Sequence, residues 1–185
     1  MFFARLRKDI AAAKRNDPAA RNKFEIWLTY SGVHALSWHR WANRLYKMHL
    51  KLLARMTSQF AKFLTGIEIH PAAKIAPGVF IDHGTGVVIG ETCIIGSHVR
   101  IYQGVTLGAK SFKFDAAGNI LREPRHPILE DRVVVYSNSS ILGRVRIGHD
   151  TVIGGNVWQT TDLPPHSRVV QGRATVSGFE NGGGI

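Results

Sequence analysis

The sequence contains a single cysteine, Cys93, among its 185 residues. One thiol excludes an intramolecular disulfide and any metal site built from several cysteines. Long apolar runs are also missing, because the longest candidate, residues 26–39, is too short for a membrane span and contains Ser31, Gly32 and His34. The first residues lack the apolar core and cleavage site of a secretory signal. We therefore expect a cytoplasmic globular protein with no membrane segment.

Acidic residues are scarce in the first third of the chain. Residues 1–62 hold 13 of the 24 Lys and Arg but only 3 of the 13 Asp and Glu, so nearly all of the net charge of +11 lies there. A nucleic-acid or anionic-surface patch is one interpretation, and the field could also attract a small polyanion. The basic residues alternate with apolar residues, which favours a solvated helical face and no nucleic-acid partner.

A helical pattern runs from about Pro18 to Leu64. Asp17 before Pro18 is typical of a helix start, because the carboxylate caps the helix and the proline ring needs no N–H partner. Gly32 indicates a break between two helices, and Gly66 indicates the final stop. Ten apolar residues recur at helical spacing and predict packing between helices or subunits: Trp38, Trp41, Ala42, Leu45, Met48, Leu52, Leu53, Met56, Phe60 and Phe63.

The period changes after Gly66. An Ile, Leu or Val then falls every six positions in two runs: Ile69, Ile75, Ile81, then Ile89, Ile95, Ile101 and Leu107, and later Leu129, Val135, Ile141, Ile147 and Ile153. This spacing is the hexapeptide signature of a parallel β-helix, in which stacked coils bury the aliphatic residues. Cys93 falls in the accompanying series of small residues, so we expect a buried core thiol. The chain therefore divides into a helical region, residues 1–66, and a β-helix, residues 67–170.

Two interruptions of the repeat are the candidate functional segments. Ile81 to Ile89 has two extra residues, and the stretch from about 109 to 127 must form a loop that leaves the β-helix. Insertions in solenoids collect on one face and often carry binding residues.

The interruptions contain residues suited to acid–base chemistry. His83 could take a proton from a hydroxyl, with Glu68 or Asp82 orienting its ring, and His126 is a second candidate. Arg125 could hold a substrate carboxylate with two hydrogen bonds. A histidine near glycines can equally be an ordinary loop residue, and the histidines show no compact metal-ligand spacing.

Several motifs resemble those of bacterial serine O-acetyltransferases, members of the hexapeptide-repeat acyltransferase superfamily. The motifs are residues 67–75 (IEIHPAAKI), 81–92 (IDHGTGVVIGET), 103–108 (QGVTLG) and 125–127 (RHP), with 17–19 (DPA) and 30–35 (YSGVHA) upstream. The similarity covers residues 17–165. It implies a mainly β fold, a left-handed parallel β-helix with an N-terminal α-helical region.

The resemblance also implies the reaction, which is acetyl transfer from acetyl-CoA to the hydroxyl of L-serine. His83 would be the general base and Glu68 its carboxylate partner, where many members have Asp. Asp17, Asp82, Arg125 and His126 would line the serine site. Gly108, Ala109, Ser137, Gly154 and Gly155 would line the acetyl-CoA groove, with no metal cofactor.

The resemblance further implies partners. A homotrimer is expected, a dimer of trimers being the alternative, with L-cysteine as feedback inhibitor. The flexible tail, residues 171–185, ends in Ile185 and resembles the family tail that binds O-acetylserine sulfhydrylase.

Other functions stay open at this stage. The chain could acetylate the hydroxyl of a sugar or xenobiotic, act as a β-helical carbonic anhydrase, or serve as a non-catalytic scaffold for the sulfhydrylase.

Overall fold

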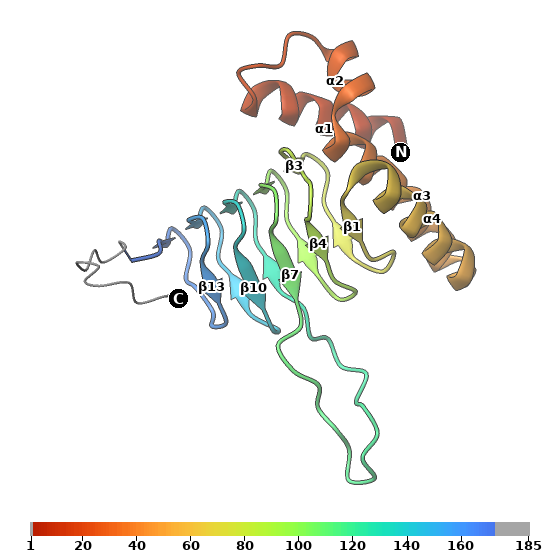
Figure 1. Ribbon diagram of the computed structural model, residues 1–185, viewed down its shortest axis with the longest axis vertical. Helices are drawn as coiled ribbons and strands as arrows, with labels where there is room; N and C mark the ends of the chain where they lie inside the picture. Colours follow the sequence, from red (N-terminus) through yellow and green to blue (C-terminus); the bar gives the residue numbers. More distant parts are fainter. Residues whose placement is uncertain (1, 173–185) are drawn as a thin grey trace, which may run out of the picture.

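The computed structural model describes residues 2–172, so Ile185 and nearly all of the expected tail lie outside the described part. The helices come first: α1 (Phe2–Asn16), α2 (Lys23–Thr29), α3 (Ser31–Lys47) and α4 (Lys51–Thr65). Short strands follow and wind into a parallel β-helix, with the helices at the end where the strands begin (Figure 1). A long loop leaves the β-helix near its middle (Figure 1).

The strands form three parallel sheets, which are the three faces of a triangular coil. The β1 sheet contains β1 (Glu68–Ile69), β4 (Val88–Ile89), β7 (Thr106–Gly108), β10 (Ser140–Leu142) and β13 (Trp158–Gln159). The β2 sheet contains β2 (Lys74–Ile75), β5 (Ile94–Ile95), β8 (Ile128–Leu129) and β11 (Arg146–Ile147). The β3 sheet contains β3 (Phe80–Ile81), β6 (Arg100–Ile101), β9 (Val134–Val135), β12 (Val152–Ile153) and β14 (Arg168–Val169). The chain visits the three sheets in turn, so three successive strands make one coil.

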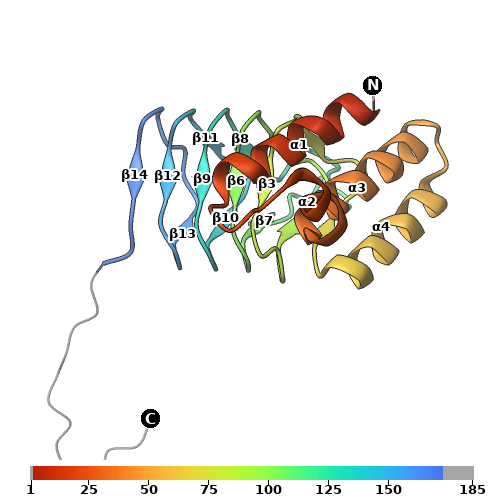
Figure 2. The same cartoon turned by 90° about the horizontal axis from the view of Figure 1, so that it is seen from above.

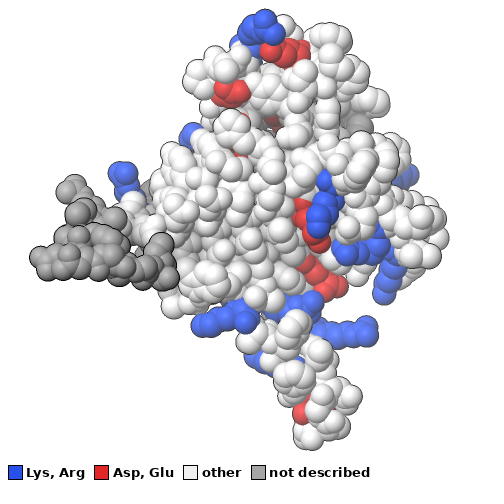
Figure 3. All heavy atoms as spheres, viewed as in Figure 1, with Lys and Arg blue, Asp and Glu red and all other residues white. Residues whose placement is uncertain are grey.

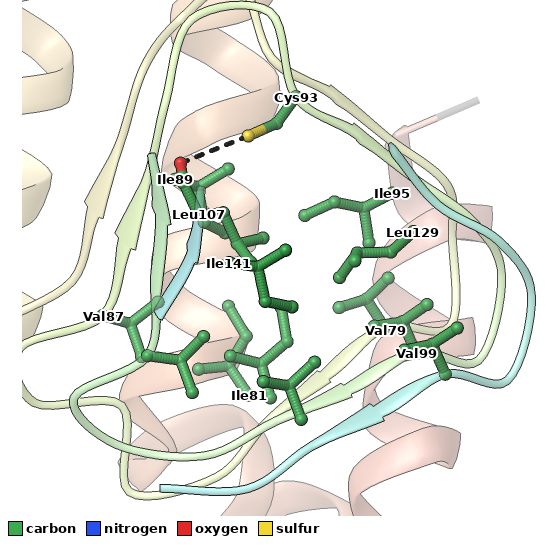
Figure 4. Packing of buried hydrophobic residues seen from close by; sticks show 14 of the residues in the cluster. Val79, Ile81, Val87, Ile89, Cys93, Ile95, Val99, Leu107, Leu129 and Ile141 are labelled. Carbon is green, nitrogen blue, oxygen red and sulfur yellow. Dashed lines mark hydrogen bonds between the residues drawn. The ribbon is translucent and has the colours of Figure 1, made fainter. Parts of the chain in front are cut away.

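The aliphatic series lies in the core, as the six-residue period predicts. Ile89 pairs with Ile69 in the preceding coil and with Leu107 in the next. Of the twelve predicted positions all but Ile75 are buried, and they form one continuous cluster (Figure 4). Cys93 is 1% exposed within this cluster, and its thiol faces the carbonyl oxygen of Leu107 at 3.5 Å (Figure 4). The prediction of a buried core thiol is confirmed.

Both interruptions of the repeat lie at corners, so the pairing of the strands continues past them. The first lies between β3 and β4. The second, residues 109–127, projects between β7 and β8 (Figure 1). Within this loop Phe114 and Ile120 form an antiparallel bridge, and Lys113 pairs with Glu123 at 2.9 Å.

The start of the helical region differs from the prediction. Residues 2–16 already form α1, so Asp17 follows a helix and caps none. Its Oδ1 accepts a hydrogen bond from the N–H of Ala19 at 2.8 Å, which makes a turn. The side-chain cap of the next helix is Asn22, which accepts from the N–H of Glu25 at 2.9 Å. The reason is that an Asp-Pro pair suits a tight turn as well as a helix start.

Gly32 does not break a helix, because it lies in the first turn of α3. The break falls at Tyr30, and the turn between α3 and α4 contains no glycine. Gly32 is instead required by packing, since a Cβ there would overlap the carbonyl oxygen of Ile81. Gly66 does end α4, with a φ of 71°, as predicted.

The helices pack against the first coil of the β-helix. α1 and α3 contact β3 (Figure 2). α4 contacts β1. Trp38 of α3 meets Phe60 of α4 edge to face at 5.4 Å, as the predicted apolar stripe requires. Phe60 and six other members of the stripe are nevertheless exposed, namely Trp41, Met48, Leu52, Leu53, Met56 and Phe63. Among residues 2–172, no helix has the length and apolar character needed to cross a bilayer.

Candidate active site

The corner between β3 and β4 presents Asp82 and His83. The side chain of His83 is 71% exposed, and its Nε2 lies 3.9 Å from Oδ2 of Asp82. His83 has a φ of 56°, but most of the other non-glycine residues with positive φ, such as Arg132, Asn138 and Asp150, also stand at turns of the coil. The conformation of His83 is therefore a property of the fold, and only its position makes it a candidate.

The helical region brings Asp17 to this same corner. The hydroxyl of Tyr30 donates a hydrogen bond to Oδ2 of Asp17. Burial, this hydrogen bond and the nearby carboxylates of Asp17 and Asp82 raise the pKa of Tyr30 to about 12. The pKa of Tyr102, next to Asp82 in the following coil, is raised by burial, by Tyr136 and by the same two carboxylates. Two carboxylates bordered by tyrosines suit the binding of an ammonium group.

Glu68 does not contact His83 in this structure. Its Oε2 forms an ion pair with the ammonium of Lys62 at 2.5 Å. Among the described residues no hydrogen bond or ion pair joins Glu68 to His83, and the carboxylate that faces the His83 ring is Asp82. A role for Glu68 as the partner of His83 therefore requires Lys62 to release it.

The end of the long loop presents His126. This residue is 7% exposed, and its Nδ1 accepts a hydrogen bond from the N–H of Thr92 at 3.2 Å. A neutral ring that accepts at Nδ1 carries its proton on Nε2, so Nε2–H is the donor it can offer. Burial and the adjacent Arg125 lower the pKa of His126, which favours this neutral form. Gly90 is needed here, because a Cβ at that position would overlap the imidazole.

Arg125 is held in place by three contacts. Its guanidinium pairs with Oε2 of Glu91 at 3.2 Å and lies 5.5 Å from the ring centre of Phe112. The backbone N–H groups of Arg125 and His126 both donate to the hydroxyl oxygen of Thr92, at 2.9 and 3.0 Å. Thr92 therefore fixes both candidate residues, and it was not predicted.

The two groups of candidate residues occupy different corners of successive coils. Asp17, Asp82 and His83 lie where the chain enters the β1 sheet, whereas Arg125 and His126 lie after it leaves that sheet. The three residues of β7 alone span about 10 Å between these corners. No hydrogen bond or ion pair within residues 2–172 connects the two groups. One chain therefore displays two separate half-sites on opposite edges of the β1 sheet, one where its strands begin and the other where they end.

The expected acetyl-CoA residues divide between the same two edges. Ser137 and Gly155 follow β9 and β12, so the strand pairing places them along the edge that carries His83. Gly154 lies beside Gly155 on that edge. Gly108 ends β7 and Ala109 follows it, so both lie on the edge that carries His126. Gln103 lies one coil beyond His83, and its buried Oε1 has no hydrogen-bond partner among the described residues, which no sequence pattern predicts.

A basic pocket lies at the base of the long loop. Its volume is about 250 Å³, and its walls carry Lys110, Lys113, Arg125 and Arg144 against one acid, Glu123. Figure 3 shows Lys and Arg side chains gathered where the loop leaves the β-helix. Among residues 2–172, Arg144 donates only to backbone carbonyls, those of Thr92 and His126, and no carboxylate there pairs with its charge. The pocket adjoins the edge that carries Gly108 and Ala109, and its charge suits phosphate groups.

Two further groups bear on alternative chemistries. Burial raises the pKa of Cys93 to about 12, so it is unsuited to act as a nucleophile. His149, Asp150 and His166 gather within 4.8 Å at another corner, a grouping that the sequence spacing did not predict. Asp150 is already paired with both Nε and Nη2 of Arg132 at 2.6 Å. This cluster lies apart from both half-sites.

A three-sided coil of hexapeptide repeats with histidines at its edges defines the class of hexapeptide-repeat β-helix proteins. Related sequences make the assignment specific. The chain is 51% identical over 181 residues to a serine acetyltransferase of Synechococcus elongatus, covering 97% of this chain and 57% of that protein. It is 50% identical over 160 residues to the serine acetyltransferase of Helicobacter pylori, covering 86% of this chain and 89% of that protein. The chain belongs to the serine acetyltransferase family.

Solved structures agree with this assignment. Serine acetyltransferase isoform 3 of Entamoeba histolytica, in complex with cysteine, matches with a TM-score of 0.88 at 35% identity over 97% of this chain and 62% of that one. The Neisseria gonorrhoeae enzyme in complex with serine matches with a TM-score of 0.84 at 34% identity over 94% and 68%. No family model matches the chain. These neighbours confirm the predicted left-handed parallel β-helix. The chain spans just over half the length of its Synechococcus relative.

Proposed function

We propose that this protein is a serine O-acetyltransferase, which moves the acetyl group of acetyl-CoA to the hydroxyl of L-serine in the cytoplasm. The observation that carries the proposal is the pair of half-sites. One offers His83 with Asp17 and Asp82, and the other offers Arg125 and His126. Together they supply a base, anions for the ammonium of an amino acid and a cation for its carboxylate. A sugar acceptor would use neither charged set.

His83 acts as the general base in this proposal. It takes the proton from the serine hydroxyl while that oxygen attacks the thioester carbon, which forms the new C–O bond. Collapse of the tetrahedral intermediate breaks the C–S bond, and the proton passes from His83 to the departing thiolate. The direct attack uses no acyl-enzyme, which agrees with the burial of Cys93. The Nε2–H of His126 is a donor for a substrate oxygen.

A carboxylate beside the ring stabilises the imidazolium that forms on His83. Asp82 faces the ring at 3.9 Å and Glu68 is held by Lys62. We assign the role to Glu68 once Lys62 releases it, with Asp82 and Asp17 left to bind the substrate ammonium.

The catalytic unit is a homotrimer in this proposal, with a dimer of trimers as the larger alternative. The two half-sites lie on opposite edges of one sheet, so a complete site forms where the His83 edge of one copy meets the His126 edge of the next. Three copies close such a ring. The β-helix, residues 67–170, is the catalytic domain, and residues 1–66 contribute Asp17.

Acetyl-CoA lies along the groove between copies, against Gly108 and Ala109 on one edge and Ser137, Gly154 and Gly155 on the other. A related serine acetyltransferase has been solved in complex with CoA. The basic pocket beside Lys110 accommodates the phosphates of the nucleotide end. L-cysteine, bound in the Entamoeba neighbour, acts as an inhibitor that competes with serine. Ile185, outside the described residues, anchors the tail in O-acetylserine sulfhydrylase.

The deciding experiment measures thiol release from acetyl-CoA by purified protein, with L-serine, with a sugar, and with no acceptor. Release that depends on serine and falls by about 10²–10⁴ in His83→Ala supports the proposal. Release with the sugar alone indicates another hexapeptide O-acetyltransferase. If His83→Ala keeps full activity, His83 is not the general base. If no acceptor gives thiol release, the remaining function is a scaffold for the sulfhydrylase.

A further inference from the structure

A crevice of about 410 Å³ lies between α3 and the β2 sheet, separate from both half-sites. Helix residues His39, Arg40 and Lys47 line one side, and residues 73–76 and 94–96 line the other, with Arg5 of α1 at the rim. None of its lining residues belongs to the two half-sites or to the loop pocket.

The lining is strongly basic. Arg5, Arg40, Lys47 and Lys74 contribute four cations, and no acidic side chain lines the crevice. Two carboxylates lie next to the lining. Asp9 is 1% exposed, pairs with Arg40 and accepts from the N–H of Gly78. Asp131, beside Gly96, accepts from the N–H of Ser97 at 2.7 Å. Four cations beside two carboxylates leave an excess of positive charge in a confined space, which attracts anions.

Two buried polar atoms of the lining have no partner among the described residues. They are Nδ1 of His39 and Nη1 of Arg40. His39 is 5% exposed, and the side chain of Arg40 is 10% exposed. A buried polar group without a partner costs about 1–3 kcal/mol, so such atoms mark a position where a missing partner binds.

The two atoms differ in kind. Nη1 of Arg40 can only donate. Burial, followed by the charge of Arg40, lowers the pKa of His39 to about 3, so its ring is neutral at pH 7. The ring also forms a hydrogen bond with the backbone of Ala73, and this bond uses the remaining nitrogen, which leaves Nδ1 as an acceptor.

We propose that this crevice binds a phosphate group, with Arg40, Lys47 and Lys74 neutralising its charge and Nδ1 of His39 accepting a hydrogen bond from its P–OH. Monohydrogen phosphate has both anionic oxygens and one proton to donate. Sulfate has the same shape and charge but no proton at pH 7. The lone pair of His39 therefore selects phosphate over sulfate. This inference does not depend on the proposed acetyl transfer.

The test is calorimetric titration of the full chain with inorganic phosphate, in a phosphate-free zwitterionic buffer at pH 7.5, against sulfate. We expect one phosphate per chain and at least tenfold weaker binding of sulfate. The variant Lys47→Gln/Lys74→Gln should bind phosphate at least tenfold more weakly than the wild type. The control Lys8→Gln/Lys23→Gln removes the same charge outside the crevice and should bind as the wild type does.

Three results overturn the proposal. The first is no saturable binding at millimolar phosphate. The second is an equal loss of phosphate affinity in the two double variants, and the third is equal affinity of the wild type for sulfate and phosphate. A thermal melt without phosphate shows whether each variant is folded. His39→Gln supplies a separate readout, because it should lose the preference over sulfate while the lysine pair still attracts both anions.

Discussion

Gly32, in the first turn of α3, lies directly against the carbonyl oxygen of Ile81, the residue before Asp82. This contact sets the distance between the helical region and the corner that carries His83. It also explains how Asp17 and Asp82, distant in the sequence, come to flank the same tyrosines.

Gly32→Ala should destabilise the protein by about 1–3 kcal/mol, because the added methyl forces α3 away from β3. The kcat should also fall by more than the loss of folded protein explains, because the corner next to Ile81 moves. Denaturant unfolding and steady-state kinetics measure the two effects. Gly172→Ala, where no described residue lies within 4 Å of the added atom, is the matched control and should change neither. Wild-type stability in Gly32→Ala would contradict the packing argument.

The carboxylate partner of His83 can be identified by neutral substitutions. We expect Glu68→Gln to lower kcat by about tenfold or more with little change in the KM for serine, because it acts on the base. Asp82→Asn should mainly raise the KM for serine, because it acts on the ammonium. Lys62→Met frees Glu68 and should preserve kcat. A fall of kcat in Asp82→Asn alone would instead assign the partner role to Asp82, which faces the ring in this structure.

The basic pocket predicts a specific dependence on the 3′-phosphate of CoA. Lys110 lines this pocket and has no ion-pair partner among the described residues. We expect Lys110→Gln to raise the KM for acetyl-CoA by about three- to tenfold, because one exposed charge pair contributes about 1 kcal/mol. The KM for acetyl-dephospho-CoA should not change. Arg132→Gln is a control far from the loop. Equal effects of Lys110→Gln on both co-substrates would place that phosphate elsewhere.

Burial of His39 predicts how stability depends on pH. Its pKa is lowered to about 3 in the folded protein from 6.5, so the unfolded chain binds the extra proton between these values. The free energy of unfolding should therefore fall as the pH drops below about 6.5, by up to about 1.4 kcal/mol per pH unit, until it levels near pH 3. His70 and His126 act in the same direction, because burial lowers their pKa values too.

Urea unfolding at several pH values in a phosphate-free buffer measures this slope. His39→Gln should flatten it, whereas His98→Gln, at an exposed position, should leave it unchanged. An identical slope in wild type and His39→Gln would show that His39 does not supply the linkage.

The prediction of the helical region failed where one local signal serves two structures. Asp17 and Pro18 suit a turn as well as a helix start, and the residues of α1 gave no distinct cap. Gly32 was interpreted as a break because glycine disfavours helices, but its reason is a contact with Ile81, about fifty positions away in the sequence. The role of Thr92 was missed for the same cause, since its partners Arg125 and His126 lie beyond the loop.

The six-residue period was enough to predict the β-helix, its corners and its buried thiol, because it dictates which side chains point inward regardless of distant contacts. Family motifs were enough to indicate acetyl transfer and the candidate residues. The folded chain was needed to show that these residues form two half-sites on opposite sides of the β1 sheet, that Glu68 pairs with Lys62, and that His39 and Arg40 meet in a basic crevice. Such placements depend on how separate coils and helices pack, and no local spacing records them.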